Sequence, residues 1–222
     1  MPSTACCSTR FGPLEIAYDE RVLEPRAWTI LQSRWAAELS GDLPEGPMLE
    51  LCAGAGQIGL AALEGNDRRL VQVDLNPVAC EFAERNALAA GLSDRVETRC
   101  GDLRSAVADG ERYPLVLADP PYVPTDEVDE HPADPVEAVD GGADGLRLLC
   151  ACLDVVERAL DPHGAALVQV LGEAQAKELG RVLPDGLELV EVRAHDDRRA
   201  VVHLRWADGA PAGHDGQEQL QR

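Results

Sequence analysis

One short segment of the chain joins a carboxylate, two prolines and an aromatic ring. Asp119, Pro120, Pro121 and Tyr122 follow the apolar run at 115–118. The Asp119 side chain and the Pro120 carbonyl are hydrogen-bond acceptors, and neither proline has an N–H that would compete for them. Together they can hold the N–H groups of a planar NH2 nitrogen, while the Tyr122 ring stacks on its plane. The segment could therefore hold a planar NH2 group, with Asp119, Pro120 and Tyr122 as candidate catalytic residues and Pro121 and Tyr122 against the substrate.

A glycine-rich turn lies upstream, between an apolar run and a helical pattern. Gly54, Gly56 and Gly59 satisfy the spacing G-x-G-x-x-G, and Asp74 ends the next apolar run. Glycines in such a turn let the backbone approach a ligand closely, and a strand-ending acid can accept from ribose hydroxyls. The turn predicts a nucleotide-containing ligand, either a nicotinamide dinucleotide or S-adenosylmethionine.

Acids at three expected strand ends favour S-adenosylmethionine. Glu50 could attract its ammonium group, Asp74 could accept from its ribose hydroxyls, and Asp102 could accept from its adenine amino group. Asp102 is equally compatible with a simple helix cap. With S-adenosylhomocysteine as the product, the predicted cofactor contacts are Glu50, Cys52, Ala53, Gly54, Gly56, Ile58, Asp74, Leu75, Asp102, Leu103 and Asp119.

Short apolar runs alternate with helical patterns from residue 47 onward, as is typical of βα units. We expect an α/β fold with a doubly wound, seven-stranded, mostly parallel Rossmann-like sheet that ends in an antiparallel C-terminal hairpin. Parallel strands would bring the glycine turn and Asp119 to one edge of that sheet. The expected strands are 48–52, 70–75, 95–99, 115–118, 165–171, 187–192 and 200–206, and the expected helices are 58–64, 77–90, 144–160 and 173–182.

The same pattern divides the chain into three parts. Residues 1–46 are expected to form an arm and a helix (25–39) that cover the active site, and residues 47–206 the catalytic domain. Residues 207–222 contain almost no apolar side chains and are expected to be a disordered tail.

Composition argues against several classes of protein. The 222 residues carry 40 acidic and 20 basic side chains, a formal net charge of −20, which opposes the basic surface of a nucleic-acid-binding protein. The apolar runs are strand-sized and no signal peptide is recognisable, so we expect a cytoplasmic protein without a membrane partner. The 7 cysteines are odd in number and lack zinc-site spacing, so neither a disulfide framework nor a metal is predicted.

Four motifs together resemble the HemK or PrmC family of release-factor glutamine N5-methyltransferases. The matching segments are the arm 22–26 with Thr29, the glycine turn, the Asp119 segment, and residues 138–146 with their Asp-Gly-Gly core. The resemblance implies a class I fold and methyl transfer from S-adenosylmethionine to a nitrogen. The acceptor would be a protein glutamine or an amine-bearing small metabolite, including a cationic one. Pro25, Arg26 and Thr29 are implied as substrate contacts.

The chain departs from that family at three places. Few residues precede the Pro25–Arg26 arm, where bacterial members carry a helical domain that recognises the release factor, so we expect that mode of capture to be missing. Asp119 replaces an asparagine whose amide both donates and accepts, whereas a carboxylate only accepts; an amine therefore suits Asp119 better than a carboxamide. Ala27 and Trp28 replace a proline and an acid, so the wall of the substrate pocket is expected to differ.

The loop that follows Tyr122 is strongly acidic. Residues 119–146 include nine acids and no Lys or Arg. Such a run is usually a solvated surface. It could instead form a lid that attracts a cationic substrate.

Two other functions stay open. The Asp119 segment also resembles enzymes that methylate adenine N6 or guanine N2, although the net charge of −20 argues against nucleic acid as a partner. The glycine turn alone would fit an NAD-dependent oxidoreductase. The sequence does not predict an oligomeric state.

Overall fold

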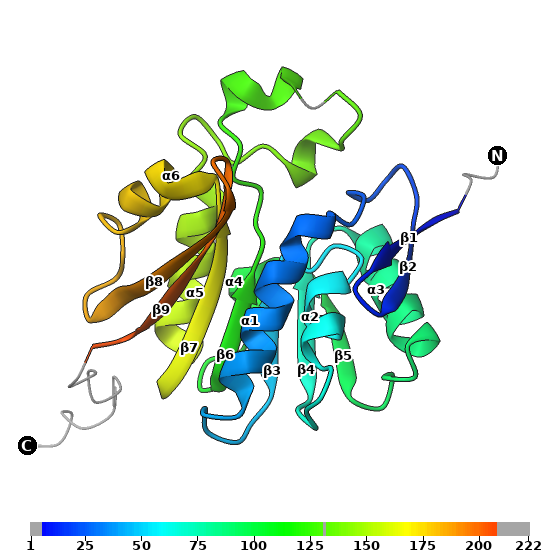
Figure 1. Ribbon diagram of the computed structural model, residues 1–222, viewed down its shortest axis with the longest axis horizontal. Helices are drawn as coiled ribbons and strands as arrows, with labels where there is room; N and C mark the ends of the chain where they lie inside the picture. Colours follow the sequence, from blue (N-terminus) through cyan, green and yellow to red (C-terminus); the bar gives the residue numbers. More distant parts are fainter. Residues whose placement is uncertain (1–5, 131, 208–222) are drawn as a thin grey trace, which may run out of the picture.

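A seven-stranded sheet forms the centre of the molecule (Figure 1). The computed structural model describes residues 6–130 and 132–207. The strands are β3 (Met48–Leu51), β4 (Leu70–Asp74), β5 (Val96–Cys100), β6 (Tyr113–Ala118), β7 (Leu160–Val170), β8 (Leu187–Asp196) and β9 (Arg199–Trp206). Their order is β5-β4-β3-β6-β7-β9-β8, with parallel pairing from β5 to β7 and antiparallel pairing of β9 to both neighbours. The predicted α/β fold and its C-terminal hairpin are confirmed.

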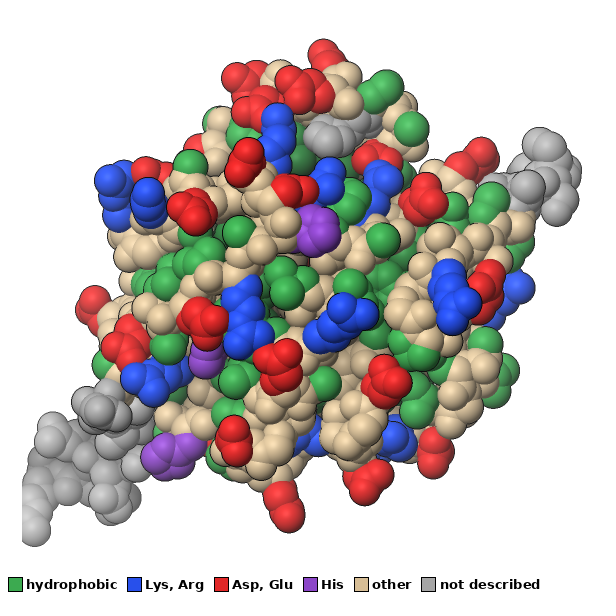
Figure 2. Space-filling model, viewed as in Figure 1, with side chains coloured by type: hydrophobic (Ala, Val, Ile, Leu, Met, Phe, Trp, Pro, Cys, Tyr) green, Lys and Arg blue, Asp and Glu red, His purple; other side chains and the backbone are tan. Residues whose placement is uncertain are grey.

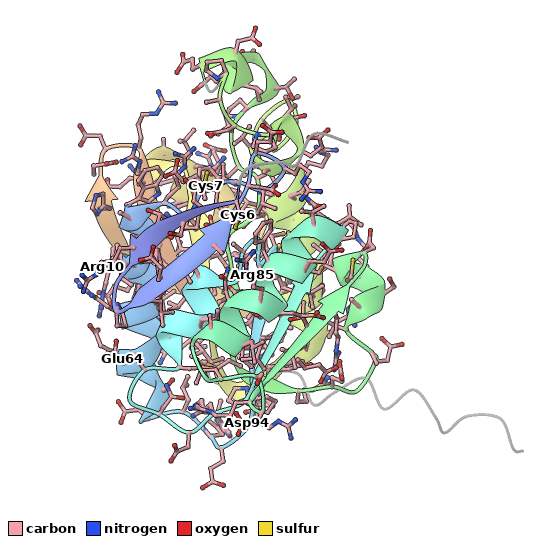
Figure 3. All side chains as sticks on the ribbon, turned by 90° about the vertical axis from the view of Figure 1, so that its right-hand side faces the viewer. Cys6, Cys7, Arg10, Glu64, Arg85 and Asp94 are labelled. Carbon is pink, nitrogen blue, oxygen red and sulfur yellow. The ribbon has the colours of Figure 1, made fainter. Side chains whose placement is uncertain are left out.

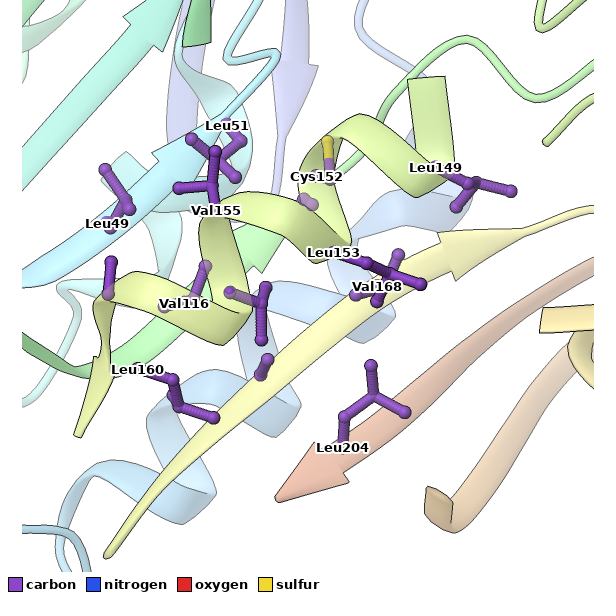
Figure 4. Close-up of a cluster of buried hydrophobic side chains, with 14 of the residues drawn as sticks. Leu49, Leu51, Val116, Leu149, Cys152, Leu153, Val155, Leu160, Val168 and Leu204 are labelled. Carbon is purple, nitrogen blue, oxygen red and sulfur yellow. The ribbon is translucent and has the colours of Figure 1, made fainter. Parts of the chain in front are cut away.

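Helices cover both faces of the sheet because the central strands β3, β6 and β7 carry buried side chains on both sides. On one face lie α1 (Ile30–Ser40), α2 (Gln57–Ala62) and α3 (Pro77–Ala89); on the other lie α4 (Leu103–Ala106), α5 (Arg147–Ala159) and α6 (Gly172–Leu179). Figure 4 shows how α5 packs: Leu149, Cys152 and Leu153 point from the helix toward the sheet. Their spacing of three and four residues places them on one helical face, and all are at most 1% exposed. Burial of each leucine stabilises the fold by roughly 1.5–3 kcal/mol.

The first part of the chain contains a hairpin that the sequence analysis missed. β1 (Cys7–Phe11) pairs with β2 (Leu14–Tyr18) around a Gly12–Pro13 turn, and Gly12 has a φ of +57° that favours glycine. Two-residue turns between short β-rich runs are a recognisable hairpin signal. The hairpin packs on α3, where Asn86 Oδ1 accepts from Ala17 N at 2.9 Å. Figure 3 shows Arg85 of α3 beneath the hairpin, with its guanidinium donating to Cys6 Sγ at 3.2 Å.

Several boundaries differ from those expected. The helix expected over 25–39 is a short 3₁₀ turn, η1 (Ala27–Thr29), followed by α1. The Trp35 side chain of α1 is 1% exposed and packs in a core cluster with residues of the sheet. The helix expected from Asp144 begins at Arg147, because Asp144 Oδ1 accepts from Leu146 N and forms a turn first. The short helix α4 and the 3₁₀ turns η2 (Thr125–Glu130) and η3 (Val136–Ala138) were not predicted.

Two expectations concern the ends of the chain and the membrane. The tail expected over 207–222 lies outside the described residues except for Ala207. Among the helices of the described residues, none has the length and apolarity needed to cross a membrane.

Candidate functional site

A pocket of about 720 Å³ opens at the carboxyl ends of β3, β4, β5 and β6. Parallel strands place the residues that follow them at one edge of the sheet, which is where open α/β sheets bind ligands. The wall includes Gly54, Asp74, Asp102 and Asp119, one from each of these strand ends. Residues 21–23 of the arm and residues 135–138 of the loop after β6 complete it.

The glycine turn has the left-handed backbone expected of a tight phosphate- or nucleotide-type turn. Gly54 and Gly56 have φ values of +56° and +84°. A Cβ on Gly56 would lie 2.7 Å from Gln72 Nε2 and 3.3 Å from the Ala83 backbone, so α3 packs directly against the turn. Among the described residues, Cys52 is the only non-glycine with a positive φ, at +57°. The strained backbone at Cys52 sets the path by which the chain leaves β3 and enters the glycine turn at the pocket.

Glu50 is buried behind the turn and is absent from the pocket wall, and its direct contact with a ligand stays a prediction. Leu49 and Leu51 pack toward α5, so alternation along β3 directs Glu50 toward α2. Its carboxylate accepts from Gly59 N at 3.0 Å and from Gln72 Nε2 at 2.7 Å, and the residue is 2% exposed. Burial raises the pKa of Glu50 to about 7, although these two donors oppose the rise. Glu50 therefore stabilises the glycine turn from its buried side through these hydrogen bonds.

Replacement of this buried acid should change how stability depends on pH. The folded-state pKa of about 7 exceeds the ordinary value of 4.5, so the contribution of Glu50 is most favourable below pH 4.5 and is lost as pH rises through about 7. We expect the free energy of unfolding of Glu50→Gln, relative to wild type, to increase over that window by at most roughly 3 kcal/mol. Urea unfolding at a series of pH values measures this. A difference that stays flat between pH 4.5 and 7 would contradict it.

Asp74 occupies the position predicted for a ribose-binding acid. Its carboxylate accepts from Gly54 N at 2.7 Å and from Asn76 N at 2.8 Å, which ties the end of β4 to the glycine turn. Burial raises its pKa, and these backbone donors oppose the rise. The next residue, Leu75, is 71% exposed and lines the pocket. An apolar side chain beside a fixed carboxylate suits a nucleoside, which has a planar base and a diol.

Asp102 caps a helix and also lines the pocket. Its side chain accepts from Arg104 N at 2.8 Å and caps α4, while the residue also lines the pocket together with Leu103. Four predicted cofactor contacts are absent from the described pocket wall and lie behind it: Glu50, Ala53, Gly56 and Ile58.

Gln57 is a pocket residue that the sequence analysis missed. It begins α2 directly after the glycine turn and lines the pocket. Its Oε1 atom is shielded from solvent and has no hydrogen-bond partner among the described residues. An unpartnered buried acceptor in a pocket wall indicates that a ligand with N–H groups completes it. The ammonium group of S-adenosylmethionine is such a donor, so the residues present fit this cofactor.

The Asp119 segment meets the pocket from β6. Asp119 and Pro121 line it, and Pro120 is buried. Burial raises the pKa of Asp119 to about 7. The segment is held by the Asp-Gly-Gly loop, because Val123 N donates to Val139 O at 3.0 Å and Gly141 N donates to Val123 O at 2.8 Å. Two motifs that are separate in the sequence are thereby brought together.

Tyr122 connects Asp119 to side chains from distant parts of the chain. Burial raises the pKa of the Tyr122 hydroxyl and the Asp119 carboxylate adds to the rise, whereas Arg199, Trp28 and Gln169 oppose it. Gln169 is 2% exposed on β7, and Arg199 begins β9. The sequence did not predict a role for Gln169 or Arg199. For Trp28 it predicted only a change in the wall of the substrate pocket. No local pattern connects them.

Residues of the arm contact one another and the loop after β6. Pro25 is buried, and Thr29 is 2% exposed with its Oγ1 donating to Arg26 O at 2.9 Å. Arg26 forms an ion pair with Asp134 of the loop after β6. None of these three residues is in the pocket wall. In the structure Arg26 and Thr29 fix the arm and join it to the loop, and their role as substrate contacts stays a prediction.

Arginines from other elements pair with acids of the loop after β6. Arg198, in the turn before β9, contacts Glu127 at 2.8 Å and Glu130 at 3.7 Å. Arg147, at the start of α5, lies 3.8 Å from Asp140. Figure 2 shows acidic side chains together with several basic ones over this end of the molecule. These pairs reduce the field that the acids could exert on a cationic substrate.

Comparison with known proteins identifies similar sequences and folds. A family model described as "Methyltransferase small domain" matches residues 35–177. The chain is 33% identical over 203 residues to the ribosomal protein uL3 glutamine methyltransferase of Bradyrhizobium diazoefficiens, covering 86% of this chain and 62% of that protein. It is 34% identical over 218 residues to the release factor glutamine methyltransferase of Rhodospirillum rubrum, covering 92% and 65%. The predicted family resemblance is confirmed.

Solved structures agree on the fold. The ribosomal protein L11 methylase of Lactobacillus delbrueckii subsp. bulgaricus superposes with a TM-score of 0.63 at 12% identity, over 85% of this chain and 83% of that one. The two sequence relatives are longer than the part that matches, since this chain spans less than two thirds of each.

Proposed function

Because this chain belongs to the methyltransferase small domain family, we propose that it transfers a methyl group from S-adenosylmethionine to the side-chain nitrogen of a protein glutamine. The observation that carries the proposal is the single pocket in which the glycine turn and Asp74 meet Asp119 and Pro121. The names of the two relatives, which both refer to glutamine, support this acceptor over a nucleobase.

The cofactor, when bound, supplies a methyl group on a positively charged sulfur. We assign the ribose hydroxyls to Asp74, the adenine amino group to Asp102 and the ammonium group to Gln57, because these side chains present acceptors in one pocket wall. The glycine turn lets the backbone approach the same ligand closely. The chain's contribution to cofactor binding is thus a set of acceptors fixed before the ligand arrives.

The acceptor nitrogen is positioned by Asp119 and the Pro120 carbonyl, which accept from its N–H groups. A new N–C bond forms as the S–C bond breaks, and the electron pair of the broken bond stays on sulfur. The nitrogen loses one proton, which the Asp119 carboxylate can take because its pKa of about 7 lies near neutrality. Most of the acceleration is expected from alignment of the two reactants.

A direct test uses the purified chain with S-adenosylmethionine and two candidate substrates: a release factor carrying its Gly-Gly-Gln loop, and ribosomal protein uL3. We expect mass spectrometry to find one added methyl group on a glutamine of one of them. Calorimetry with S-adenosylhomocysteine provides the control for cofactor binding. If the cofactor binds and neither protein is methylated, the glutamine proposal is overturned.

An amine-bearing small metabolite is the second candidate acceptor. Asp119 favours it, because a carboxylate and a carbonyl together offer only acceptors to the substrate. An amine has N–H groups and no carbonyl that needs a donor. Methylation of small amines in the same assay, without methylation of either protein, would support this candidate.

A further inference from the structure

The two prolines of the Asp119 segment limit how the sheet can hold its backbone. Pro120 and Pro121 have no N–H group, so neither can donate to a neighbouring strand. Asp119 N donates to Leu51 O at 3.4 Å, longer than the usual distance of about 2.9–3.0 Å. The pairing of β6 with β7 ends at Ala118, directly before the segment. Other groups must therefore fix the position of the segment.

A glutamine of α1 binds the carbonyl that precedes the segment. Gln32 Nε2 donates to Ala118 O at 3.1 Å and to Leu167 O of β7 at 2.9 Å. The residue is 0% exposed, and its Oε1 atom has no partner among the described residues, so these two carbonyls orient the amide. One side chain thereby joins β6 to β7 at the point where their pairing ends.

A glutamine of α6, on the other face of the sheet, binds the carbonyl at the far end of the segment. Gln175 Nε2 donates to Tyr122 O at 2.9 Å and to Gly145 O at 3.4 Å. Its Oε1 atom accepts from Leu171 N, directly after β7, at 2.7 Å, and the residue is 8% exposed. A Cβ on Gly145 would collide with Tyr122 O, so the loop and the segment are in close contact there.

The reacting groups of the proposed transfer lie between these two bound carbonyls. Neither glutamine lines the pocket, so neither is placed to bind a ligand, and both connect the segment to β7. An amide suits this task because its nitrogen offers two N–H groups. Misplacement of a reacting group by about 1 Å can lower a rate by about 100-fold, so the positions of these carbonyls matter for alignment.

We propose that Gln32 and Gln175 are positioning residues for methyl transfer. They fix the backbone on both sides of the Asp119 segment and thereby set where the Asp119 carboxylate and the Pro120 carbonyl meet the acceptor nitrogen. This role rests on the proposed function, because it places those two acceptors relative to the cofactor pocket.

The first test is Gln32→Met, which keeps the approximate size of the side chain and removes its N–H groups. We expect kcat for methylation of the release factor or uL3 to fall by about 10- to 100-fold, while KM for the protein and affinity for S-adenosylhomocysteine stay within about threefold. Ser40→Ala is the matched control. Ser40 is also buried on α1 and donates to a carbonyl, Ala36 O at 2.9 Å, but within the helix, so kcat should stay within about twofold.

Two variants of Gln175 separate its contacts and serve if Gln32→Met does not fold. Gln175→Glu keeps an oxygen that accepts from Leu171 N but cannot donate to Tyr122 O, whereas Gln175→Met loses both hydrogen bonds. Both should lower kcat by about tenfold or more, again with little change in cofactor affinity. Wild-type kcat in Gln175→Glu would show that the bond to Tyr122 O does not position the segment, and would overturn the inference for Gln175.

Hydrogen exchange followed by mass spectrometry tests the inference without an acceptor. The amides of Asp119, Tyr122 and Val123 should exchange at least about tenfold faster in Gln32→Met and Gln175→Glu than in Ser40→Ala, with unchanged exchange in β4. Unchanged exchange at these amides, or wild-type kcat in both glutamine variants, would overturn the inference and leave glutamine methylation standing. Absence of methylation by the wild-type chain with bound cofactor would instead overturn the proposed function, and the exchange rates would still decide whether the two glutamines hold the segment.

Discussion

Asp119→Ala is expected to reduce kcat for methyl transfer by about 10²- to 10³-fold while cofactor affinity stays within a few-fold of wild type. Asp119 lines the pocket from the end of β6 and accepts from the acceptor nitrogen, whereas the assigned cofactor contacts come from β3, β4 and β5. Alanine removes the acceptor and leaves those contacts intact. Single-turnover kinetics with S-adenosylmethionine, together with calorimetry for S-adenosylhomocysteine, separates the two effects.

The pH profile adds an independent readout of the same residue. Burial raises the pKa of Asp119 to about 7, and only the ionised form can take the proton of the nitrogen. Wild-type kcat/KM should therefore rise as pH increases through about 7 and level off above it. Asp119→Asn does not titrate and should lack this rise. A profile that is the same in both proteins, or full turnover in Asp119→Ala, would rule out the assigned role.

Asp74→Ala should weaken S-adenosylmethionine binding by about 100-fold, with a much smaller change in kcat at saturating cofactor. The substitution removes the acceptor assigned to the ribose, and it also leaves Gly54 N and Asn76 N without the carboxylate that now fixes the glycine turn. Loss of charged hydrogen bonds at a buried site costs roughly 1.5–3 kcal/mol each. Titration with S-adenosylhomocysteine measures the change directly.

Two variants control for that experiment. Asp74→Asn keeps one acceptor oxygen and should lose less affinity than Asp74→Ala. Asp94→Ala removes an exposed acid just before β5, at the far end of the sheet (Figure 3), and should leave affinity unchanged. If Asp74→Ala binds the cofactor as tightly as Asp94→Ala does, Asp74 holds only the turn.

The fold and the location of the site were predictable because their signals are local in the sequence. Three signals can each be recognised from a few neighbouring residues: apolar runs of strand length, glycines at fixed spacing and the Asp119 segment. Parallel pairing then forces the ends of consecutive strands to one edge, so the meeting of Gly54, Asp74 and Asp119 in one pocket follows from the βα pattern. The N-terminal hairpin was missed although its Gly12–Pro13 turn is also a local signal.

Other features were decided only by packing between residues far apart in the chain. Alternation along β3 places Glu50 in the core, where its carboxylate accepts hydrogen bonds from Gly59 N and Gln72 Nε2 and supports the turn. The Thr29 hydroxyl likewise donates a hydrogen bond to Arg26 O within the arm. Which face a side chain occupies depends on what covers that face, and a strand pattern alone does not state it.

By itself the sequence determined the α/β fold, the two motifs that meet in the pocket and the family to which the chain belongs. The tertiary structure alone decided which acids of the loop after β6 are paired with arginines, and that Trp28 lies under Arg199. Backbone propensity and the spacing of motif residues depend on a few neighbouring residues, so they can be recognised directly in the sequence. Side-chain contacts across 171 positions, from 28 to 199, exist only after the sheet has formed and brought the ends of its strands together.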